Sequence, residues 1–374
     1  MNVALVHDWL TGMRGGEKCL EVLCELFPRA HLYTLVWNRG TVSKTIEGMP
    51  IHPSFVDRIP GKTGGYRHYL PVFPRAIESL DVRGYDLIIS TSHCVAKGAI
   101  PGKGSLCLCY CLTPMRYVWE LEDVYFTRER YGFLRRWAIG QITRRLRSWD
   151  KATVNRVHTF AAISRFVAAR IKEHYGRDAE VIFPPVDTDY YRSSDNSTKR
   201  EDFFLIVSAL VPYKKIEIAM EAFRGNPSRL LIIGQGTERR TLERTAPSNV
   251  RFLGRVGNEV VRDHYRRCRA VLFPGIEDFG IVPLEAQACG APVIAYRAGG
   301  ALETVLEKKT GLFFDEQTPH GLRGALEESQ RVCFDESAMR RNAERFSRAR
   351  FVHEIKEFIR RAWDEHRGQG ELPW

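Results

Sequence analysis

Residues 277–285 read EDFGIVPLE, and the residues on either side predict a strand, a loop and a helix in succession. A buried strand is expected over 270–273 (AVLF) before this stretch, and another over 292–295 (PVIA) after it. Pro283 suits the first position of a helix, because its missing N–H would be unsatisfied there, and Gly290 suits the position after the helix end. The stretch therefore predicts a strand–loop–helix junction of an α/β sheet.

This junction predicts an anion site with two carboxylates beside it. Amide N–H groups at the start of a helix point outward and carry partial positive charge, which favours a phosphate. Glu277 and Glu285 are not expected to bind phosphate, because a carboxylate beside a nucleotide holds hydroxyls instead. We therefore expect phosphate at the helix N-terminus and hydroxyls at the two glutamates.

The rest of the chain alternates buried strands with helical runs, which is the pattern of parallel sheets covered by helices. In the first half, strands are expected near residues 2–6, 30–36, 86–90, 105–110, 158–163 and 179–183. In the second half, they are expected near residues 203–208, 229–233, 250–253, 270–273, 292–295 and 311–314. The polar stretch 187–202 lacks apolar periodicity and predicts a linker. A length of 374 residues also favours two domains.

The composition narrows the class of protein. Hydrophobic residues make up 44% of the chain and charged residues 27%, which is typical of a folded protein. No stretch approaches the roughly 20 apolar residues that span a bilayer, and the N-terminal MNVALVHDWL predicts a buried strand and no signal peptide. Nine cysteines without a Cys-x-x-Cys pair predict reduced cytoplasmic thiols and no zinc site.

The net charge of +11 is concentrated between residues 128 and 147, where seven arginines and one glutamate give +6. Apolar residues from Leu134 to Trp149 recur there with helical spacing. Two interpretations stay open: a basic amphipathic segment on an anionic membrane surface, and a packed helix with a solvated arginine face. A nucleic-acid partner is disfavoured, because the chain has no recognisable reading helix or RNA-binding motif.

The loop DWLTGMRGGEK at 8–18 contains Gly15 and Gly16, which let the backbone approach a ligand closely. Its spacing is not Gly-x-Gly-x-x-Gly, so a nicotinamide dinucleotide site is disfavoured. PGKTGG at 60–65 and GAIPGKGS at 98–105 do not match the phosphate loop of ATPases either. We expect the first loop to face a phosphate-bearing ligand, although a tight turn before a helix is the simpler alternative.

These motifs together resemble the retaining glycosyltransferases of family 4, which carry a Glu-x7-Glu motif. In the C-terminal half, the similar segments are LVPYKKIEIAMEAF (210–223), LIIGQGTERRTLE (231–243), VRFLGRV (250–256), AGGALETV (298–305) and TGLFFD (310–315). In the N-terminal half, they are VALVHDWLTGMRGGEKCLEVLCELFP (3–28), STSHCVAKG (90–98), YCLTPMRYVWE (110–120) and FPPVDTDYY (183–191). The set covers nearly the whole chain and looks most like mannosyltransferases that build O-antigen and exopolysaccharide repeats.

The resemblance implies an α/β fold of the GT-B type, with two Rossmann-like domains facing each other across a deep cleft. Residues 1–186 would bind the acceptor, residues 203–348 the nucleotide sugar, and a helix over 349–366 would cross back to the first domain. A hexose would pass from GDP-mannose to an acceptor with retention of configuration, without a cofactor or a metal. The acceptor would be a glycan on a polyprenyl diphosphate, met from the cytoplasm at the inner face of the membrane.

By the same resemblance, Glu277 and Lys214 are the catalytic residues, with Glu277 binding the sugar hydroxyls and stabilising an oxocarbenium-like transition state. The donor-binding residues are expected to be Gly15, Gly16, Lys215, Arg255, Phe279, Gly280, Ile281, Val282 and Glu285. Ammonium groups at a strand–helix junction suit a leaving diphosphate. The family commonly has an arginine five residues before Lys214, where this chain has Ala209, and Lys215 is the cation that would replace it.

The acceptor-binding residues are expected to be Asp8, His93 and Arg116. The family often places a histidine where this chain has Leu112, so His93 and His7 become the candidates to contact substrate. A histidine at a strand end is more often structural, and that alternative stays open for both. Arg116 suits an anionic group of the acceptor.

Two other functions stay open at this point. A glycosidase would use Glu277 and Glu285 as acid and nucleophile, but such pairs flank the scissile bond from separate elements, and these two share one short segment. A non-enzymatic scaffold for membrane or nucleic acid would not need Glu277 at all. Release of nucleotide from a nucleotide sugar distinguishes a transferase from both.

Overall fold

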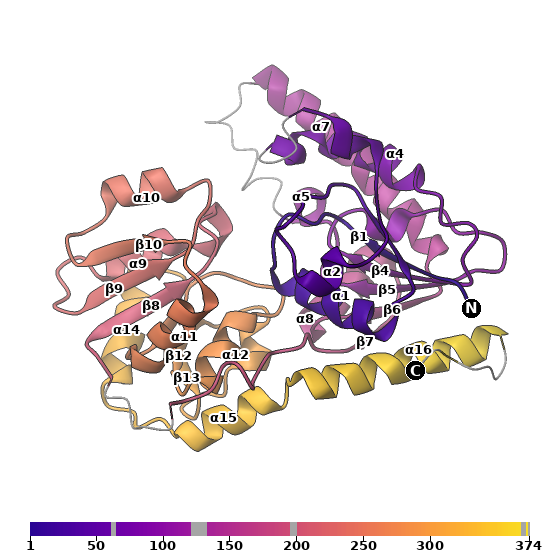
Figure 1. The fold of residues 1–374 in the computed structure, drawn as a ribbon. Helices are drawn as coiled ribbons and strands as arrows, with labels where there is room; N and C mark the ends of the chain where they lie inside the picture. Colours follow the sequence, from indigo (N-terminus) through magenta and orange to yellow (C-terminus); the bar gives the residue numbers. More distant parts are fainter. Residues whose placement is uncertain (61–64, 121–132, 195–199, 368–371, 373–374) are drawn as a thin grey trace. The chain divides into compact units, whose positions relative to one another are not determined.

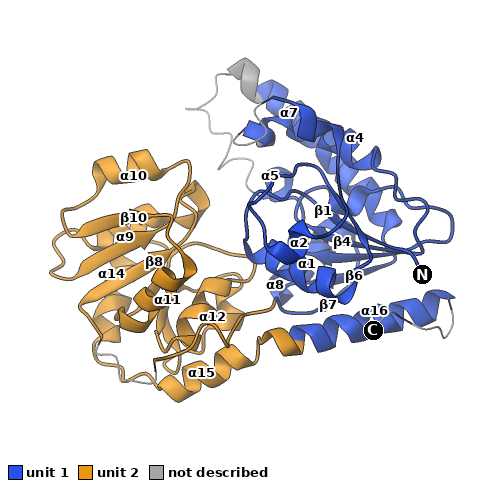
Figure 2. Cartoon of the chain, in the orientation of Figure 1, with its two compact units in different colours: residues 1–184, 351–374 blue, residues 185–350 orange. Residues whose placement is uncertain are grey.

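The computed structural model describes residues 1–60, 65–120, 133–194, 200–367 and 372 (Figure 1). The chain divides into two compact units, one of Met1–Pro184 with Phe351–Trp374 and one of Pro185–Arg350 (Figure 2). Each unit is built on a parallel sheet, so the predicted α/β class with two Rossmann-like domains is confirmed. How the two domains face each other stays a prediction.

The N-terminal unit contains a seven-stranded sheet with the strand order β3-β2-β1-β4-β5-β6-β7. Its strands are β1 (Val3–His7), β2 (His31–Thr34), β3 (Ile51–Pro53), β4 (Leu87–Ser92), β5 (Leu106–Cys111), β6 (Thr159–Ala162) and β7 (Ala179–Val181). Its α-helices are α1 (Gly15–Leu26), α2 (Lys44–Glu47), α4 (Phe73–Glu78), α5 (Arg116–Trp119), α7 (Phe133–Ala152) and α8 (Arg165–Tyr175). Its short 3₁₀ helices are η1 (Phe55–Arg58), η2 (Tyr66–Val72), η3 (Ala96–Gly98) and η4 (Thr153–Arg156). Every residue of β1, β4 and β5 is buried, as parallel strands covered on both faces require.

The sequence analysis missed β3, which has the three residues IHP. This strand lies at the edge of the sheet and pairs only with β2. His52 and Pro53 are exposed, and proline is tolerated at an edge, where its missing N–H breaks no ladder. A strand of three residues with two of them exposed leaves no apolar run to detect.

The C-terminal unit contains a six-stranded parallel sheet with the strand order β10-β9-β8-β11-β12-β13. Its strands are β8 (Phe203–Val207), β9 (Arg229–Ile233), β10 (Val250–Gly254), β11 (Val271–Phe273), β12 (Val293–Tyr296) and β13 (Gly311–Phe314). Its helices are η5 (Pro212–Lys214), α9 (Ile216–Ala222), α10 (Arg239–Thr245), α11 (Asn258–Arg267), α12 (Ile281–Ala288), α13 (Ala301–Thr304), α14 (Pro319–Ser329) and α15 (Glu336–Glu344). All six strands coincide with predicted ones to within a residue at each end.

The segment predicted as a linker is packed on the C-terminal unit in part, through Thr188 and Tyr191. The chain enters this unit at Pro185, ahead of the predicted linker 187–202. Tyr191 is 4% exposed and belongs to the core of the unit. The Arg340 guanidinium donates hydrogen bonds to the carbonyls of Thr188 (2.6 Å) and Tyr191 (3.1 Å), which explains why a polar segment is held in place.

The last helix, α16 (Arg348–Arg367), starts in the C-terminal unit and belongs to the N-terminal unit from Phe351 onward (Figure 2). The Phe351 ring packs edge to face on Tyr110 of β5, with centroids 5.6 Å apart. Further along, the Arg361 guanidinium pairs with Glu180 of β7 at 2.6 Å. The C-terminal helix is therefore a structural part of the N-terminal unit.

Each sheet has one place where the strand order reverses, which is where open α/β sheets bind ligands, outside the carboxyl ends of the strands. In the N-terminal sheet this switch point lies between β1 and β4, and in the C-terminal sheet it lies between β8 and β11. The loops that leave these four strands carry Asp8, His93, Lys214 and Glu277. These four of the residues singled out from the sequence therefore lie at the switch points of their own sheets, whereas Arg116 follows β5 and Arg255 follows the edge strand β10.

Candidate active site

The stretch EDFGIVPLE connects β11 to α12, as predicted. The helix begins at Ile281 directly after Gly280, whose φ of 93° is in the left-handed region that favours glycine. Pro283 is the third helical residue, so its predicted place at the first position is wrong by two residues. The N–H groups of the whole first turn lack an intrahelical acceptor, which is why proline is tolerated there. Gly290 follows the helix end with a φ of 83°.

The loop before α12 is held by close backbone packing against two glycines. The N–H of Gly300 donates to the carbonyl of Glu277 at 2.8 Å. A Cβ atom on Gly300 would lie 2.2 Å from the Phe279 oxygen, and one on Gly299 would lie 2.5 Å from the Glu277 oxygen. Any side chain at these positions would push the loop away. The sequence does not reveal this role of the two glycines in AGGALETV, because a contact between two loops leaves no local pattern.

Glu277 and Lys214 form an ion pair, in which the Lys214 ammonium donates a hydrogen bond to Oε1 of Glu277. The two side chains are 22% and 11% exposed, so the pair is shielded but still open to solvent. The ammonium also lies 5.0 Å from the centre of the Tyr213 ring. Gly275 permits this approach, because a Cβ there would lie 2.9 Å from the Lys214 Cα. The fold thus brings together the two residues that the sequence indicated as catalytic, 63 positions apart.

Lys215 is directed to a different partner. Its ammonium lies 3.6 Å from Oε1 of Glu217, and its side chain is 40% exposed. Its backbone has a φ of 54° and a ψ of 37°, a left-handed conformation that costs energy in a residue with a side chain. Such strain is common at functional sites. The role of Lys215 as the cation that compensates for Ala209 stays a prediction.

Glu285 lies in the second turn of α12 and is 6% exposed. The hydroxyl of Tyr265, from α11, donates to Oε2 of Glu285 at 3.3 Å. Burial raises the pKa of Tyr265, and the nearby carboxylate raises it further, so the hydroxyl remains a proton donor. The sequence analysis missed Tyr265, because one tyrosine in an amphipathic helix does not differ from an ordinary core residue.

Two other predicted donor-binding residues have unlike surroundings. Phe279 is 3% exposed and packs on Phe346, with ring centroids 5.6 Å apart, so its ring is part of the packed interior. Arg255 follows β10 and is exposed. Gly280, Ile281 and Val282 are each half-buried at the start of α12.

In the N-terminal unit, the glycine-rich loop leads directly into α1, which begins at Gly15. A Cβ on Gly16 would lie 2.7 Å from Cδ1 of Leu112 and 3.6 Å from Cε1 of His7. Gly16 therefore lets the helix start pack against the end of β5. His7 is fully buried and its Nδ1 lies 2.6 Å from the Thr91 hydroxyl, so this histidine is structural.

The Asp8 carboxylate is completely buried and is bound by the loop that follows β4. Its two oxygens accept hydrogen bonds at 2.6–2.9 Å from four backbone N–H groups, those of residues 93, 94, 95 and 96. Burial alone would raise the pKa of Asp8, but the charge and hydrogen bonds of His93 outweigh it and lower the pKa to about 2. The predicted contact of Asp8 with an acceptor has no exposed atom to make it, because both oxygens serve the loop.

His93 keeps part of its surface exposed. Its Nδ1 lies 3.1 Å from Oδ2 of Asp8, and 24% of its side chain is accessible. The Trp9 ring meets the imidazole edge to face, with centroids 4.4 Å apart. Arg116, the third predicted acceptor residue, is the first residue of α5 and is half-buried. The acceptor-binding roles of His93 and Arg116 stay predictions.

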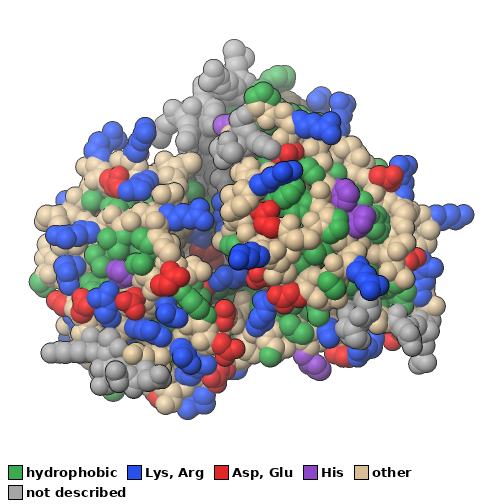
Figure 3. Space-filling model, viewed as in Figure 1, with side chains coloured by type: hydrophobic (Ala, Val, Ile, Leu, Met, Phe, Trp, Pro, Cys, Tyr) green, Lys and Arg blue, Asp and Glu red, His purple; other side chains and the backbone are tan. Residues whose placement is uncertain are grey.

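The basic segment 128–147 coincides in part with α7. Residues 128–132 lie outside the described residues, among them Arg128 and Arg130. In the described part of the helix, Leu146 is buried in the core while Arg144 and Arg145 are exposed. On the face shown in Figure 3, Lys and Arg side chains are interspersed with acidic ones on both units. The second half of α7 is thus a packed helix with solvated arginines.

The exposed end of α7 keeps the membrane alternative open, because Trp137 is 63% exposed. No helix within the described residues is long and apolar enough to cross a membrane. Across the same residues, no three His, Cys, Asp or Glu side chains are grouped so that they could hold a metal ion. All nine cysteines are free thiols, and eight of them are buried.

Comparison with known proteins agrees with this geometry. Residues 187–344 match the family described as glycosyl transferases group 1. An uncharacterized glycosyltransferase of Methanocaldococcus jannaschii is 29% identical over 167 residues, which are 43% of this chain and 46% of that protein. A GDP-mannose-dependent alpha-(1-6)-phosphatidylinositol monomannoside mannosyltransferase of Mycolicibacterium smegmatis is 31% identical over 182 residues, 41% of this chain and 48% of that protein. The chain thus matches about half the length of these relatives.

Structural similarity extends over both units. The crystal structure of Anabaena Alr3699/HepE in complex with UDP covers 96% of this chain and 99% of its own, with a TM-score of 0.69 and 18% sequence identity. At this identity the likeness shows the fold alone. The chain therefore has the GT-B fold of two Rossmann-like domains, and its residues 187–344 match the glycosyl transferases group 1 family.

Proposed function

We propose that the protein is a retaining glycosyltransferase that moves a hexose from a nucleotide diphosphate sugar to an acceptor hydroxyl. The observation that carries this proposal is the β11–α12 junction, where the half-buried residues 280–282 begin a helix shortly after Glu277, which is paired with Lys214. A helix N-terminus attracts phosphate, and a carboxylate beside it attracts hydroxyls, so the two together fit a sugar phosphate. The family match over residues 187–344 supports the same reading.

In this function, the N–H groups of Gly280, Ile281 and Val282 bind the phosphate next to the sugar. Glu285 accepts hydrogen bonds from the ribose hydroxyls, with Tyr265 holding its carboxylate in position. Arg255, the Phe279 backbone and the glycines 15 and 16 complete the contacts to the donor. Gly15, Gly16 and residues 280–282 are half-buried and Arg255 is exposed, whereas Glu285 is 6% exposed.

Glu277 and Lys214 carry the chemistry. Glu277 binds the sugar hydroxyls and its negative charge stabilises the positive charge that develops on the ring in the transition state. Lys214, with Lys215 and the helix N-terminus, stabilises the negative charge that collects on the departing diphosphate. The departing phosphate then takes the proton of the attacking hydroxyl on the same face of the sugar, which retains the configuration.

For the donor we propose GDP-mannose, supported by the similarity to a GDP-mannose-dependent mannosyltransferase. For the acceptor we propose a glycan on a polyprenyl diphosphate in the synthesis of O-antigen or related surface polysaccharide, reached by His93 and Arg116 at the inner face of the membrane. The exposed Trp137, Arg144 and Arg145 of α7 would touch anionic lipid. Equal binding of the protein to neutral and anionic vesicles would overturn the proposed contact of α7 with anionic lipid.

The decisive experiment combines binding and turnover. GDP-mannose, GDP-glucose, UDP-glucose and UDP-galactose are compared for thermal stabilisation, because a specific ligand raises the melting temperature by mass action. The preferred donor is then tested for nucleotide release, and the anomeric configuration of the product is read by NMR. We expect GDP-mannose to stabilise most and to yield an α-linked product. Absence of nucleotide release with every donor would overturn the function.

A further inference from the structure

We propose that Nε2 of His93 accepts a hydrogen bond from a sugar hydroxyl of the substrate, and that Asp8 and Lys97 are positioning residues that fix the loop carrying it. This inference rests on the proposed function and deepens it. Of these three residues, His93 alone contacts the substrate, and Asp8 and Lys97 act only by holding the loop.

The loop Ser92–Gly98 is held at one end by Asp8. Four consecutive N–H groups of this loop converge on the two oxygens of one carboxylate, which fixes the backbone around His93. The residues are 85 to 88 positions from Asp8, so the bonds join two strand ends that neighbour each other only in the folded sheet. Charge-assisted bonds of this kind are among the stronger ones in proteins.

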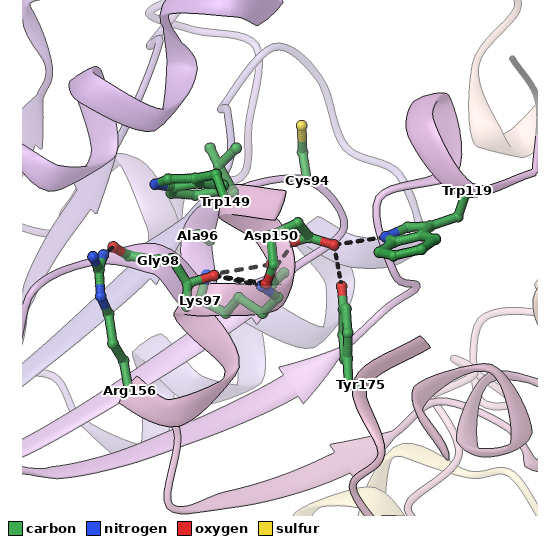
Figure 4. Close-up of polar contacts among 12 residues, drawn as sticks. Cys94, Ala96, Lys97, Gly98, Trp119, Trp149, Asp150, Arg156 and Tyr175 are labelled. Carbon is green, nitrogen blue, oxygen red and sulfur yellow. Dashed lines mark hydrogen bonds and ion pairs between the residues drawn. The ribbon is translucent and has the colours of Figure 1, made fainter. Parts of the chain in front are cut away.

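The other end of the loop is held by Lys97, whose ammonium is buried (Figure 4). It donates to the main-chain carbonyl of Asp150 at 2.7 Å and to the Thr153 hydroxyl at 2.7 Å, and it lies 2.8 Å from Oδ1 of Asp150. Oδ2 of Asp150 in turn accepts hydrogen bonds from Trp119 Nε1 and from the Tyr175 hydroxyl, both at 2.8 Å. The Lys97 ammonium therefore has two hydrogen-bond acceptors and one ion-pair partner where α7 ends and η4 begins.

The charged side chains that anchor the loop are buried. The side chains of Asp8, Lys97 and Asp150 are exposed by 0%, 1% and 0%. Burying ions costs several kcal/mol of solvation for each ion, and apolar residues of the same volume often stabilise a fold as well. Placing a buried charge at each end of a seven-residue loop is better explained by a need for exact loop geometry than by stability.

The residue between the two anchors is His93. Asp8 lies at its Nδ1 and Trp9 packs on its ring, so the orientation of the imidazole is set on two sides. The Asp8 carboxylate 3.1 Å from Nδ1 favours a ring proton on that nitrogen, and a neutral imidazole protonated there carries its lone pair on Nε2, the opposite nitrogen of the ring. Among the described residues, Nε2 has no hydrogen-bond partner. The loop leaves β4 at the switch point, so this nitrogen is an oriented acceptor where a substrate hydroxyl is expected.

The test compares His93→Gln with His52→Gln, a control that changes an exposed histidine of the same unit. Both are assayed for GDP release from GDP-mannose, or with the donor that the wild type prefers, and for the Kd of GDP. We expect kcat/KM to fall by about ten- to a hundredfold in His93→Gln alone, with the Kd of GDP unchanged. A His93→Gln enzyme within about twofold of the wild type would overturn the inference.

The positioning role is tested by a double-mutant cycle. If Asp8 acts through His93, adding His93→Gln to Asp8→Asn costs little further activity, whereas two independent roles would multiply their losses. Asp8→Asn also leaves loop N–H groups unpaired, so its folding is checked by circular dichroism. Ser92→Ala, which removes only the 3.3 Å bond from the Lys97 N–H, is the milder second variant, with a predicted loss of about two- to fivefold.

The nitrogen chemical shifts of the His93 ring give an independent readout. We expect a proton on Nδ1 in the wild type and a mixture of tautomers in Asp8→Asn. A proton on Nε2 in the wild type would contradict the proposed acceptor. A wild type that releases no nucleotide from any donor sinks the proposed function and this inference together, whereas an active wild type with an active His93→Gln sinks the inference alone.

Discussion

After β11 of the C-terminal sheet and after β1 of the N-terminal sheet, a carboxylate stands at the switch point, but the two are used in opposite ways. Glu277 is 22% exposed and is paired with a lysine that is itself partly accessible. Asp8 is wholly buried and is paired with backbone N–H groups. A ligand can therefore reach the Glu277 carboxylate, whereas the Asp8 carboxylate is accessible only to the protein groups around it.

A position at the switch point of a sheet therefore does not by itself assign a chemical role to a carboxylate. In each unit, a ligand is expected outside the carboxyl ends of the strands. Whether a carboxylate there binds the ligand or holds the neighbouring loop depends on how deeply it is buried and on the groups it is hydrogen-bonded to. In the C-terminal unit the charged side chains of Glu277 and Lys214 are themselves partly exposed. In the N-terminal unit the partly exposed group is the His93 imidazole, and the Asp8 carboxylate beside it is buried.

Replacement of Glu277 should have the largest effect. Glu277→Ala removes the partner of the developing positive charge, so nucleotide release should fall by roughly 10³-fold, or about 4 kcal/mol. Initial rates at saturating donor measure this loss. Glu221→Gln, which changes an exposed glutamate of α9 that pairs with Arg224, should leave the rate unchanged. A Glu277→Ala enzyme with wild-type turnover would remove Glu277 from the chemistry.

The buried anchor of the N-terminal unit should show its effect in stability. Lys97→Met leaves Asp150 buried without its counter-ion, which should lower the free energy of unfolding by about 3 kcal/mol. The loss is placed at the lower end of the usual range because Trp119 and Tyr175 still donate to Asp150.

The chain offers a matched control for this measurement. Lys172 pairs with Asp178 at the same 2.8 Å distance, but the two side chains are 59% and 91% exposed. When both variants are unfolded in urea, Lys172→Met should therefore lower the free energy of unfolding by less than about 1 kcal/mol. Equal losses in the two variants would show that burial of the pair at Lys97 is not what the unit depends on.

The strand–loop–helix junction at the C-terminal switch point could be predicted from the sequence for a physical reason. Glu277 and Lys214 lie in motifs with a clear local pattern, in which a strand is followed by a glycine, a proline or a lysine pair. This pattern predicts a strand–helix junction. The buried strands were predicted from apolar runs, and only the short edge strand β3 escaped. Local patterns of this kind can be recognised in the sequence without knowledge of the tertiary fold.

The role of Asp8 could not be predicted in this way. Whether its carboxylate faces a ligand or four N–H groups depends on a loop more than 80 positions away. The same holds for Lys97 and Asp150, which are 53 positions apart, and for Tyr265 beside Glu285, which is 20 positions away. Such partners are set by how strands and helices pack, and no residue type or spacing encodes them locally.

The Asp8 carboxylate should also make stability depend on pH. Its folded pKa of about 2 is below the ordinary value of 3.8, so its contribution is complete above about pH 4 and is lost as the pH falls through about 2. The contribution is on the order of 2 kcal/mol. The difference in unfolding free energy between wild type and Asp8→Asn should be constant from pH 5 to 7 and shrink below pH 4. A difference that stays constant down to pH 3 would contradict it, and Asp178→Asn serves as the exposed control.

The smallest effect compares the two neighbouring lysines of the C-terminal switch point. Lys214→Ala should lower turnover at least tenfold, about 1.4 kcal/mol, because it removes the ammonium that pairs with Glu277 and meets the leaving diphosphate. Lys215→Gly keeps the left-handed backbone that glycine adopts freely, so it isolates the loss of the side chain. Since the Lys215 ammonium is 40% exposed and lies beside Glu217, its loss should cost turnover less than that of Lys214. The reverse order would mean that Lys215 is the main cation at the diphosphate, and that the ion pair of Lys214 with Glu277 serves to hold the loop, as Asp8 does in the other unit.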